Sequence, residues 1–181
     1  MFRISLYLKD NIKLRMRAVK NILFLAVLLC AGSPAVAHHT CNQSAQIKAL
    51  AMNMYHEARG EGPDAMQLVG EVTLNRVESK HFPNTVCGVV YQAKLDSKGI
   101  PKRHACQFSW YCDGRSDKPK DKKLWDSAYA IATGLINKSI NLLGSTATHY
   151  HTENVKPSWS QKYTMLGKYG SHIFYEMGNK L

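Results

Sequence analysis

Two stretches in the first half of the chain repeat their apolar residues with the period of an α-helix. From residue 45 to about 59 the apolar positions share one face, at Ile47, Leu50, Ala51, Met54 and Tyr55. A second periodic face runs from residue 63 to about 79, and Pro63 suits the first turn of a helix. We predict two helices separated by a glycine turn at residues 60–62. Ser44 is expected to cap the first helix, and Gly70 to let helices cross closely.

Shorter patterns predict the rest of the domain. Thr85 can cap a helix of one or two turns at residues 86–91, and the polar, basic residues 93–103 predict an exposed loop. A third helix is expected at residues 122–137, from an apolar stripe at Trp125, Ala128, Ala132 and Leu135. Residues 148–152 and 173–175 predict two short strands. These elements indicate one α+β domain, mainly helical, with a small β region near the C-terminus.

The first 37 residues have the layout of a secretory signal peptide. Basic residues precede an apolar run at residues 22–30, and Ala35-Val36-Ala37 matches a cleavage signal. The apolar run is too short for a transmembrane helix. We therefore expect a signal peptide at residues 1–37, with its start at Met1 or Met16. A periplasmic or secreted domain at residues 38–181, without a stable membrane anchor, would follow.

Charge and cysteines narrow the class of protein. Without the leader, 18 Lys and Arg face 12 Asp and Glu, a net charge of +6. This charge fits a partner that is an acidic polymer, such as nucleic acid, anionic lipid or cell wall. A role of the charge in keeping the protein soluble explains it nearly as well. Four cysteines remain, which suggests two disulfides in an exported chain. Of three pairings we favour Cys106 with Cys112 and Cys41 with Cys87; zinc is less expected, because no Cys-x-x-Cys pair is present.

Glu57 has the most distinctive expected environment. It falls in the last turn of the first predicted helix, where the negative end of the helix dipole disfavours a carboxylate. That position and burial under Met54 and Tyr55 both raise the pKa of a carboxyl. A glutamate that keeps its proton near neutral pH can act as a general acid. The alternative is a solvated glutamate at a helix end, paired with Arg59.

Aromatic residues between the third and fourth of these cysteines form a second candidate feature. Phe108 is expected in the core, whereas Trp110 and Tyr111 are candidates for stacking on a sugar or a peptide. The segment is therefore either a plug of the core or the wall of a groove.

Six blocks in a fixed order are more specific than any single motif. They are Glu57-Ala58-Arg59-Gly60-Glu61-Gly62, Val72-Thr73-Leu74-Asn75-Arg76-Val77, residues 82–92, Cys106-Gln107-Phe108-Ser109, Thr148-His149-Tyr150-His151 and residues 170–175. In this order the chain resembles the cell wall hydrolases of the SleB/CwlJ type, named after spore-cortex-lytic enzymes. The resemblance covers residues 45–175, and the Glu-Ala-Arg-Gly-Glu and Leu-Asn-Arg blocks are its most specific parts.

The resemblance implies a lysozyme-like α+β fold and cleavage of the peptidoglycan glycan strand, between N-acetylmuramic acid and N-acetylglucosamine. It also implies a lytic transglycosylase with Glu57 as the one catalytic acid. The candidate substrate-binding residues are Gln107, Ser109, Trp110, His149 and Tyr150. We expect a monomer that binds glycan strands, with no nucleic acid partner, metal or cofactor.

We expect most of the other polar residues around Glu57 to have structural roles. Glu61 is expected to favour the N-terminal end of the second helix, although it is the natural second carboxylate if the reaction is hydrolysis. Glu71 lies either near the site or on the surface. Asn75 and Arg76 are expected to brace the turn around Glu57.

Two other classes of function stay open on the sequence. His149 and His151 would share one face of a strand, so with His172 they could hold the metal of an amidase or peptidase that acts on the wall's peptides. The other class is a non-catalytic wall-binding module.

Overall fold

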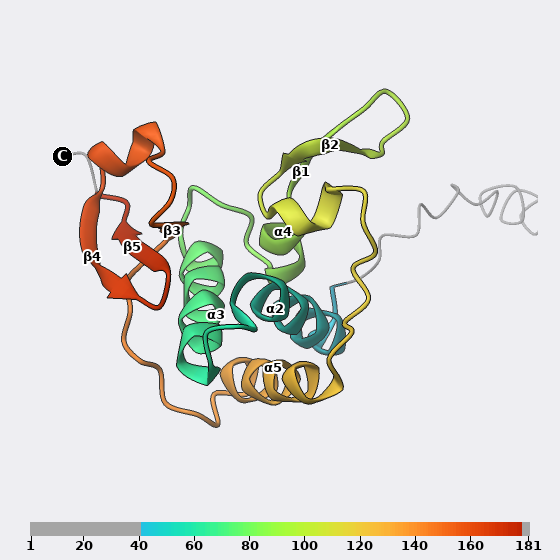
Figure 1. The fold of residues 1–181 in the computed structure, drawn as a ribbon. Helices are drawn as coiled ribbons and strands as arrows, with labels where there is room; N and C mark the ends of the chain where they lie inside the picture. The colour runs from blue at the N-terminus through green and yellow to red at the C-terminus, as the bar shows by residue number, and fades with distance from the viewer. Residues whose placement is uncertain (1–40, 179–181) are drawn as a thin grey trace, which may run out of the picture. The chain divides into compact units, whose positions relative to one another are not determined.

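The computed structural model describes residues 41–178, so the expected signal peptide lies outside the described residues. Within this range the chain forms four helices, two single-turn 3-10 helices and five strands (Figure 1). The helices are α2 (Gln43–Ala58), α3 (Pro63–Glu78), α4 (Val86–Val90), α5 (Lys122–Ile136), η1 (Ser109–Cys112) and η2 (Ser158–Gln161). The strands are β1 (Ala93–Leu95), β2 (Pro101–Cys106), β3 (His149–Thr152), β4 (Thr164–Tyr169) and β5 (His172–Glu176).

Helix α2 is the centre of the hydrophobic core and packs against α3, α4 and α5. Leu50 and Met54 on α2 are fully buried, as periodicity predicted. Gly70 on α3 permits the close packing that the sequence suggested. A Cβ atom there would lie 2.7 Å from both Met54 Sδ and Leu135 Cδ1, so a larger residue would force α2 or α5 away.

The start of α2 differs from the prediction. Asn42, rather than Ser44, caps the helix, because its side-chain oxygen accepts the Ala45 amide at 2.9 Å. Asn and Ser are equally good caps, so propensity could not choose between neighbours. The expected cap at Thr85 is confirmed, since its hydroxyl accepts the Gly88 amide at 3.0 Å.

Two β elements were missed by the sequence prediction. Residues 93–103, expected to be a loop, contribute to the antiparallel hairpin β1–β2, whose turn is fixed by Asp96 accepting the amides of Lys98 and Ile100. The C-terminal sheet has the order β3-β5-β4, so it contains three strands where two were expected. No residue of β2 or β4 is fully buried, so these strands lack the alternation that marks a half-buried strand.

Three polar side chains of α3 hold the segment that leads into β3. Glu71, only 2% exposed, accepts two backbone amides of residues 143–148, at 2.6 and 3.1 Å. Asn75 Nδ2 donates to two carbonyls of the same segment, at 2.7 and 2.9 Å. Arg76 Nε donates to a third, at 2.7 Å. Glu71 is therefore an internal brace, and Asn75 braces this segment instead of the turn after α2.

The disulfides join Cys41 to Cys87 and Cys106 to Cys112, the favoured pairing. The first links the start of α2 to α4, and the second closes the loop between β2 and η1. None of the helices formed by residues 41–178 has the length and apolar character needed to cross a membrane.

The brace at Glu71 predicts a large loss of stability on truncation. In Glu71→Ala, two backbone amides lose their carboxylate acceptor, which should lower the free energy of unfolding by about 3 kcal/mol. Urea denaturation would measure it, with Glu78→Ala as the control on an exposed position of the same helix. Equal losses in the two variants would contradict the bracing role.

Candidate active site

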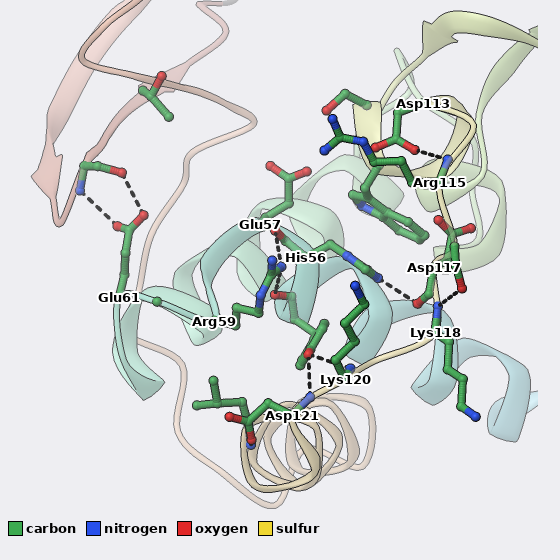
Figure 2. A pocket seen from close by; sticks show the side chains of 18 of the residues that line it. His56, Glu57, Arg59, Glu61, Asp113, Arg115, Asp117, Lys118, Lys120 and Asp121 are labelled. Atoms are coloured by element: carbon green, nitrogen blue, oxygen red, sulfur yellow. Dashed lines mark hydrogen bonds between the residues drawn. The ribbon is translucent and has the colours of Figure 1, made fainter.

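Glu57 lies in the last turn of α2, as predicted, where two cavities meet. The larger cavity has a volume of about 1040 Å³ and the smaller of about 260 Å³. Both are lined by Glu57, Ser109, Thr152 and His172, so Glu57 borders both cavities. Figure 2 shows the larger cavity. Thr152 and His172 were not among the predicted substrate contacts, although both lie in or beside the motif blocks.

Glu57 does not form the ion pair with Arg59 that the sequence offered as an alternative. Arg59 Nη1 donates to the backbone carbonyls of Tyr55 and His56, at 3.4 and 3.3 Å. Its guanidinium also lies over the Tyr55 ring, 5.1 Å from the centroid. Arg59 therefore interacts with the negative end of α2 and leaves the Glu57 carboxyl to other partners.

The side-chain partner of Glu57 is Tyr150 on β3, whose hydroxyl donates to Oε2 at 3.1 Å. Burial raises the pKa of the Glu57 carboxyl, and the Tyr150 hydrogen bond with nearby His172 and Arg76 offsets only part of this effect. Burial and the neighbouring carboxyl likewise raise the pKa of Tyr150, so its hydroxyl stays a donor. Tyr150, predicted to contact substrate, thus contacts the candidate acid.

Arg76 supplies a buried positive charge beside this pair. The residue is 3% exposed, and its guanidinium lies 5.2 and 5.3 Å from the ring centroids of Phe82 and Phe108. Within residues 41–178, its Nη1 atom has no hydrogen-bond partner. Burial favours a protonated Glu57, whereas Arg76 and Tyr150 favour an ionised one. A group that must give up a proton and later take one back needs both states to be accessible.

Glu61 lies in an environment that favours the ionised form of its carboxyl, in contrast to Glu57. Its carboxylate accepts Ser171 N at 2.9 Å and Ser171 Oγ at 2.7 Å, and it contacts His172 Nδ1 at 3.2 Å. Burial would raise the pKa of Glu61, but the bonds from Ser171 and His172 lower it overall. Gly170 makes the approach possible: its φ is +56°, and a Cβ there would lie 2.0 Å from Glu61 Oε2. Glu61 therefore ties the turn after α2 to the β4–β5 turn, which corrects its expected role at the start of α3.

The other predicted substrate contacts fall into two groups. Gln107 and Ser109 are exposed and line the smaller cavity, which Ser109 shares with the larger one. Trp110 lines the larger cavity but is only 8% exposed. Its indole N–H donates to Asn53 at 3.1 Å, and its ring stacks on His56 at a centroid distance of 4.7 Å. Most of the indole therefore belongs to the core, which leaves little of it for a sugar.

His149 lies outside both cavities, contrary to the expectation that it contacts substrate. Its ring packs against Trp159 and Tyr163, with centroids at 5.1 and 4.7 Å. Burial lowers the pKa of His149 to about 4, so the ring is neutral at physiological pH. Adjacent strand residues point to opposite faces, so Tyr150 faces Glu57 while His149 joins the aromatic cluster on the other side.

The three histidines of the metal hypothesis do not converge. His151 Nε2 is hydrogen-bonded to the Tyr175 hydroxyl at 3.0 Å, and His172 contacts Glu61. Across residues 41–178, no three His, Cys, Asp or Glu side chains gather in a way that could hold a metal ion.

The segment between η1 and α5 also forms a wall of the site. Tyr55 Oη accepts the backbone amides of Lys120 and Asp121, each at 3.0 Å. His56 Nε2 donates to the Asp117 carbonyl at 2.9 Å. The two residues that precede Glu57 therefore fix this wall beside it, a long-range contact that no local pattern signals.

Comparison with known proteins gives the family. Residues 60–175, more than half of the chain, match the model described as Cell Wall Hydrolase. A spore cortex-lytic enzyme of Oceanobacillus iheyensis is 24% identical over 153 residues, which cover 79% of this chain and 46% of that protein. One from Bacillus cereus is 26% identical over 131 residues, 71% of this chain and 43% of that protein. The chain thus spans less than half the length of these relatives.

Two solved structures share the fold. The catalytic domain of the Bacillus cereus SleB protein is 24% identical, with a TM-score of 0.55 over 81% of this chain and 99% of that one. The catalytic domain of the germination-specific lytic transglycosylase SleB from Bacillus anthracis is 23% identical, with a TM-score of 0.54 over 80% and 100%. These likenesses confirm the α+β fold expected from the sequence. The match over residues 60–175 shows more than the fold, and on that ground the chain belongs to the cell wall hydrolase family.

Proposed function

We propose that this enzyme cleaves the glycan strand of peptidoglycan as a lytic transglycosylase, with Glu57 as its one catalytic acid and base. The observation that carries the proposal is the state of Glu57: a carboxyl of raised pKa, at the junction of two cavities, with Tyr150 as its hydrogen-bond donor. Membership of the cell wall hydrolase family supports a substrate in the cell wall. The family match begins at Gly60, so the role of Glu57 rests on its geometry and on the Glu-Ala-Arg-Gly-Glu motif.

In the first step, protonated Glu57 gives its proton to the oxygen that bridges N-acetylmuramic acid and N-acetylglucosamine. The bond from this oxygen to C1 of the muramic acid breaks, and positive charge develops on that ring, where the substrate's acetamido oxygen can stabilise it. The leaving sugar departs as an alcohol. Glu57 is now a carboxylate, which the Tyr150 hydroxyl and the charge of Arg76 stabilise.

In the second step, ionised Glu57 accepts the proton of the C6 hydroxyl of the same muramic acid. The C6 oxygen bonds to C1 and gives an anhydro-muramoyl end, and the carboxyl is again protonated. One glutamate performs both transfers, which suits an environment that makes both of its protonation states accessible.

A mechanism with two carboxylates has less support. It needs a second acidic group free to act as base or nucleophile. The nearby Glu61 carboxylate is engaged by Ser171 and His172. We assign it to holding the site together.

The proposal also includes the substrate contacts and the setting. Gln107 and Ser109, exposed polar residues in the cavities, would hydrogen-bond sugar hydroxyl or acetamido groups. Residues 1–37 would export the domain to the compartment that holds the wall, where it would act as a monomer.

Replacing the acid should remove activity but not the fold. Glu57→Gln keeps the shape of the side chain, and release of soluble muropeptides should fall by about 100-fold or more. Because the folded pKa of Glu57 lies above its unfolded value, its ionisation destabilises the fold as pH rises through that pKa. The variant should therefore melt at an equal or higher temperature at neutral pH. Glu78→Gln is the control, and a folded Glu57→Gln protein that still clears peptidoglycan would refute the assignment.

The products should identify the group that attacks C1. Mass spectrometry of muropeptides released by the protein should show anhydro ends, which lack one water relative to reducing ends. Predominantly reducing ends would mean that water attacks C1, and the transglycosylase reaction would be wrong while wall cleavage stands.

The Tyr150 hydrogen bond should appear in the pH profile. Activity should fall as pH rises through the pKa of Glu57, because the acid must start protonated. The bond from Tyr150 lowers that pKa, so Tyr150→Phe should move the alkaline limb of kcat/KM to higher pH. Tyr163→Phe, outside both cavities, should leave the limb in place. An unchanged limb in Tyr150→Phe would show that the hydroxyl does not tune the acid.

A further inference from the structure

The larger cavity carries cations that the proposed reaction does not use. The Lys and Arg residues that line it are Arg59, Arg115, Lys118 and Lys120. In Figure 2 the side chains of Arg59, Arg115 and Lys120 extend toward the middle of the view, whereas that of Lys118 extends away from it. Of the described residues that line the smaller cavity, Arg76 alone is a Lys or Arg, and it is buried and bound to a backbone carbonyl. The two sides of Glu57 therefore differ in accessible positive charge.

Besides Glu57, the acidic residues that line the larger cavity are Glu61, Asp113, Asp117 and Asp121, and all of them except Asp117 accept hydrogen bonds from within the chain. Asp113 accepts the Arg115 amide at 2.7 Å, and Asp121 accepts the Leu124 amide at 3.0 Å as the cap of α5. Burial raises the pKa of Asp117, and no ion pair with this carboxyl forms among the described residues. In the part of the chain that the structure describes, no ion pair involves Arg115 or Lys120. Both side chains are thus available to an anionic ligand.

These cations have fixed places relative to Glu57. The backbone of Lys120 is bonded to Tyr55, and the Asp117 carbonyl to His56, so the last turn of α2 positions both the acid and the basic segment. Arg59 follows the acid on the same turn. A ligand bound to these cations would therefore have a defined place beside the bond that Glu57 protonates.

We propose that Arg115 and Lys120 bind carboxylates of the peptide stem that branches from N-acetylmuramic acid, so that the enzyme prefers peptide-bearing strands. This inference rests on the proposed function. The sugar rings present neutral hydroxyl and acetamide groups, whereas the peptide stem carries free carboxylates, which arginine and lysine bind well. A branch also needs more room than the strand alone, and the cationic side is the larger cavity, at about 1040 Å³ against 260 Å³.

The test removes two of these charges without touching the backbone contacts that hold the segment. Arg115→Gln with Lys120→Gln is compared with Lys48→Gln with Lys102→Gln, which removes the same charge from exposed positions outside both cavities. Each pair is made in the Glu57→Gln background, so that binding can be measured by calorimetry without turnover. The probes are soluble strand fragments with peptide stems, the same fragments stripped of peptide by an amidase, and chitotetraose.

We expect the variant with Arg115→Gln and Lys120→Gln to lose about tenfold in affinity for peptide-bearing fragments, since hydrogen bonds to charged groups contribute about this much. The control variant with Lys48→Gln and Lys102→Gln should keep its affinity. Unchanged affinity in the first variant would overturn the proposal. An equal loss for stripped fragments would also overturn it, because the anion recognised would be the lactyl carboxylate that stripping exposes. A failure of the proposed function is detected by a different measurement, because the wild-type protein would then release no muropeptide. The affinities measured in the Glu57→Gln background would still show whether the peptide stem is bound.

Discussion

The contact between Glu57 and Tyr150 is the interaction on which the rest of the site depends, because it joins the helical core to the small sheet. Glu57 comes from the end of the most buried helix and Tyr150 from β3, more than 90 residues later in the chain. Burial disfavours the ionised form of Glu57. The hydrogen bond from Tyr150 and the nearby His172 and Arg76 stabilise that form and offset part of the effect. The balance leaves a carboxyl that holds its proton more tightly than usual yet can still release it.

Helix α3 makes this contact possible without being part of it. Its side chains Glu71, Asn75 and Arg76 bind the backbone that leads into β3, and so set the position of the strand that carries Tyr150. Glu61 likewise holds the β4–β5 turn of the sheet through Ser171. Helix and sheet thus meet through polar side chains bonded to backbone as well as through the packing of Val72 against Phe174, and the hydrogen bonds fix their relative position more closely than apolar packing alone.

The sequence predicts what depends on local pattern and fails where distant partners decide. Helical periodicity places α2, α3 and α5 and puts Glu57 in a last turn. The strands β2 and β4 have no buried face to reveal them. Glu61 was misplaced because its partner Ser171 lies 110 residues away. His149 and Tyr150 are adjacent in β3, but only Tyr150 lies against Glu57. Alternation along a strand does not say which face meets the helix, so the sequence could not separate the two residues.

The wall formed by the segment between η1 and α5 is fastened to α2 through main-chain groups, the Asp117 carbonyl and the amides of Lys120 and Asp121. Main-chain groups are present whatever the side chain, proline amides excepted. Most side chains of this stretch can therefore change during evolution at little cost to folding. A lineage of wall-cleaving enzymes built on this scaffold could adapt to walls of different chemistry by varying one loop, while the acid and its supports stay constant.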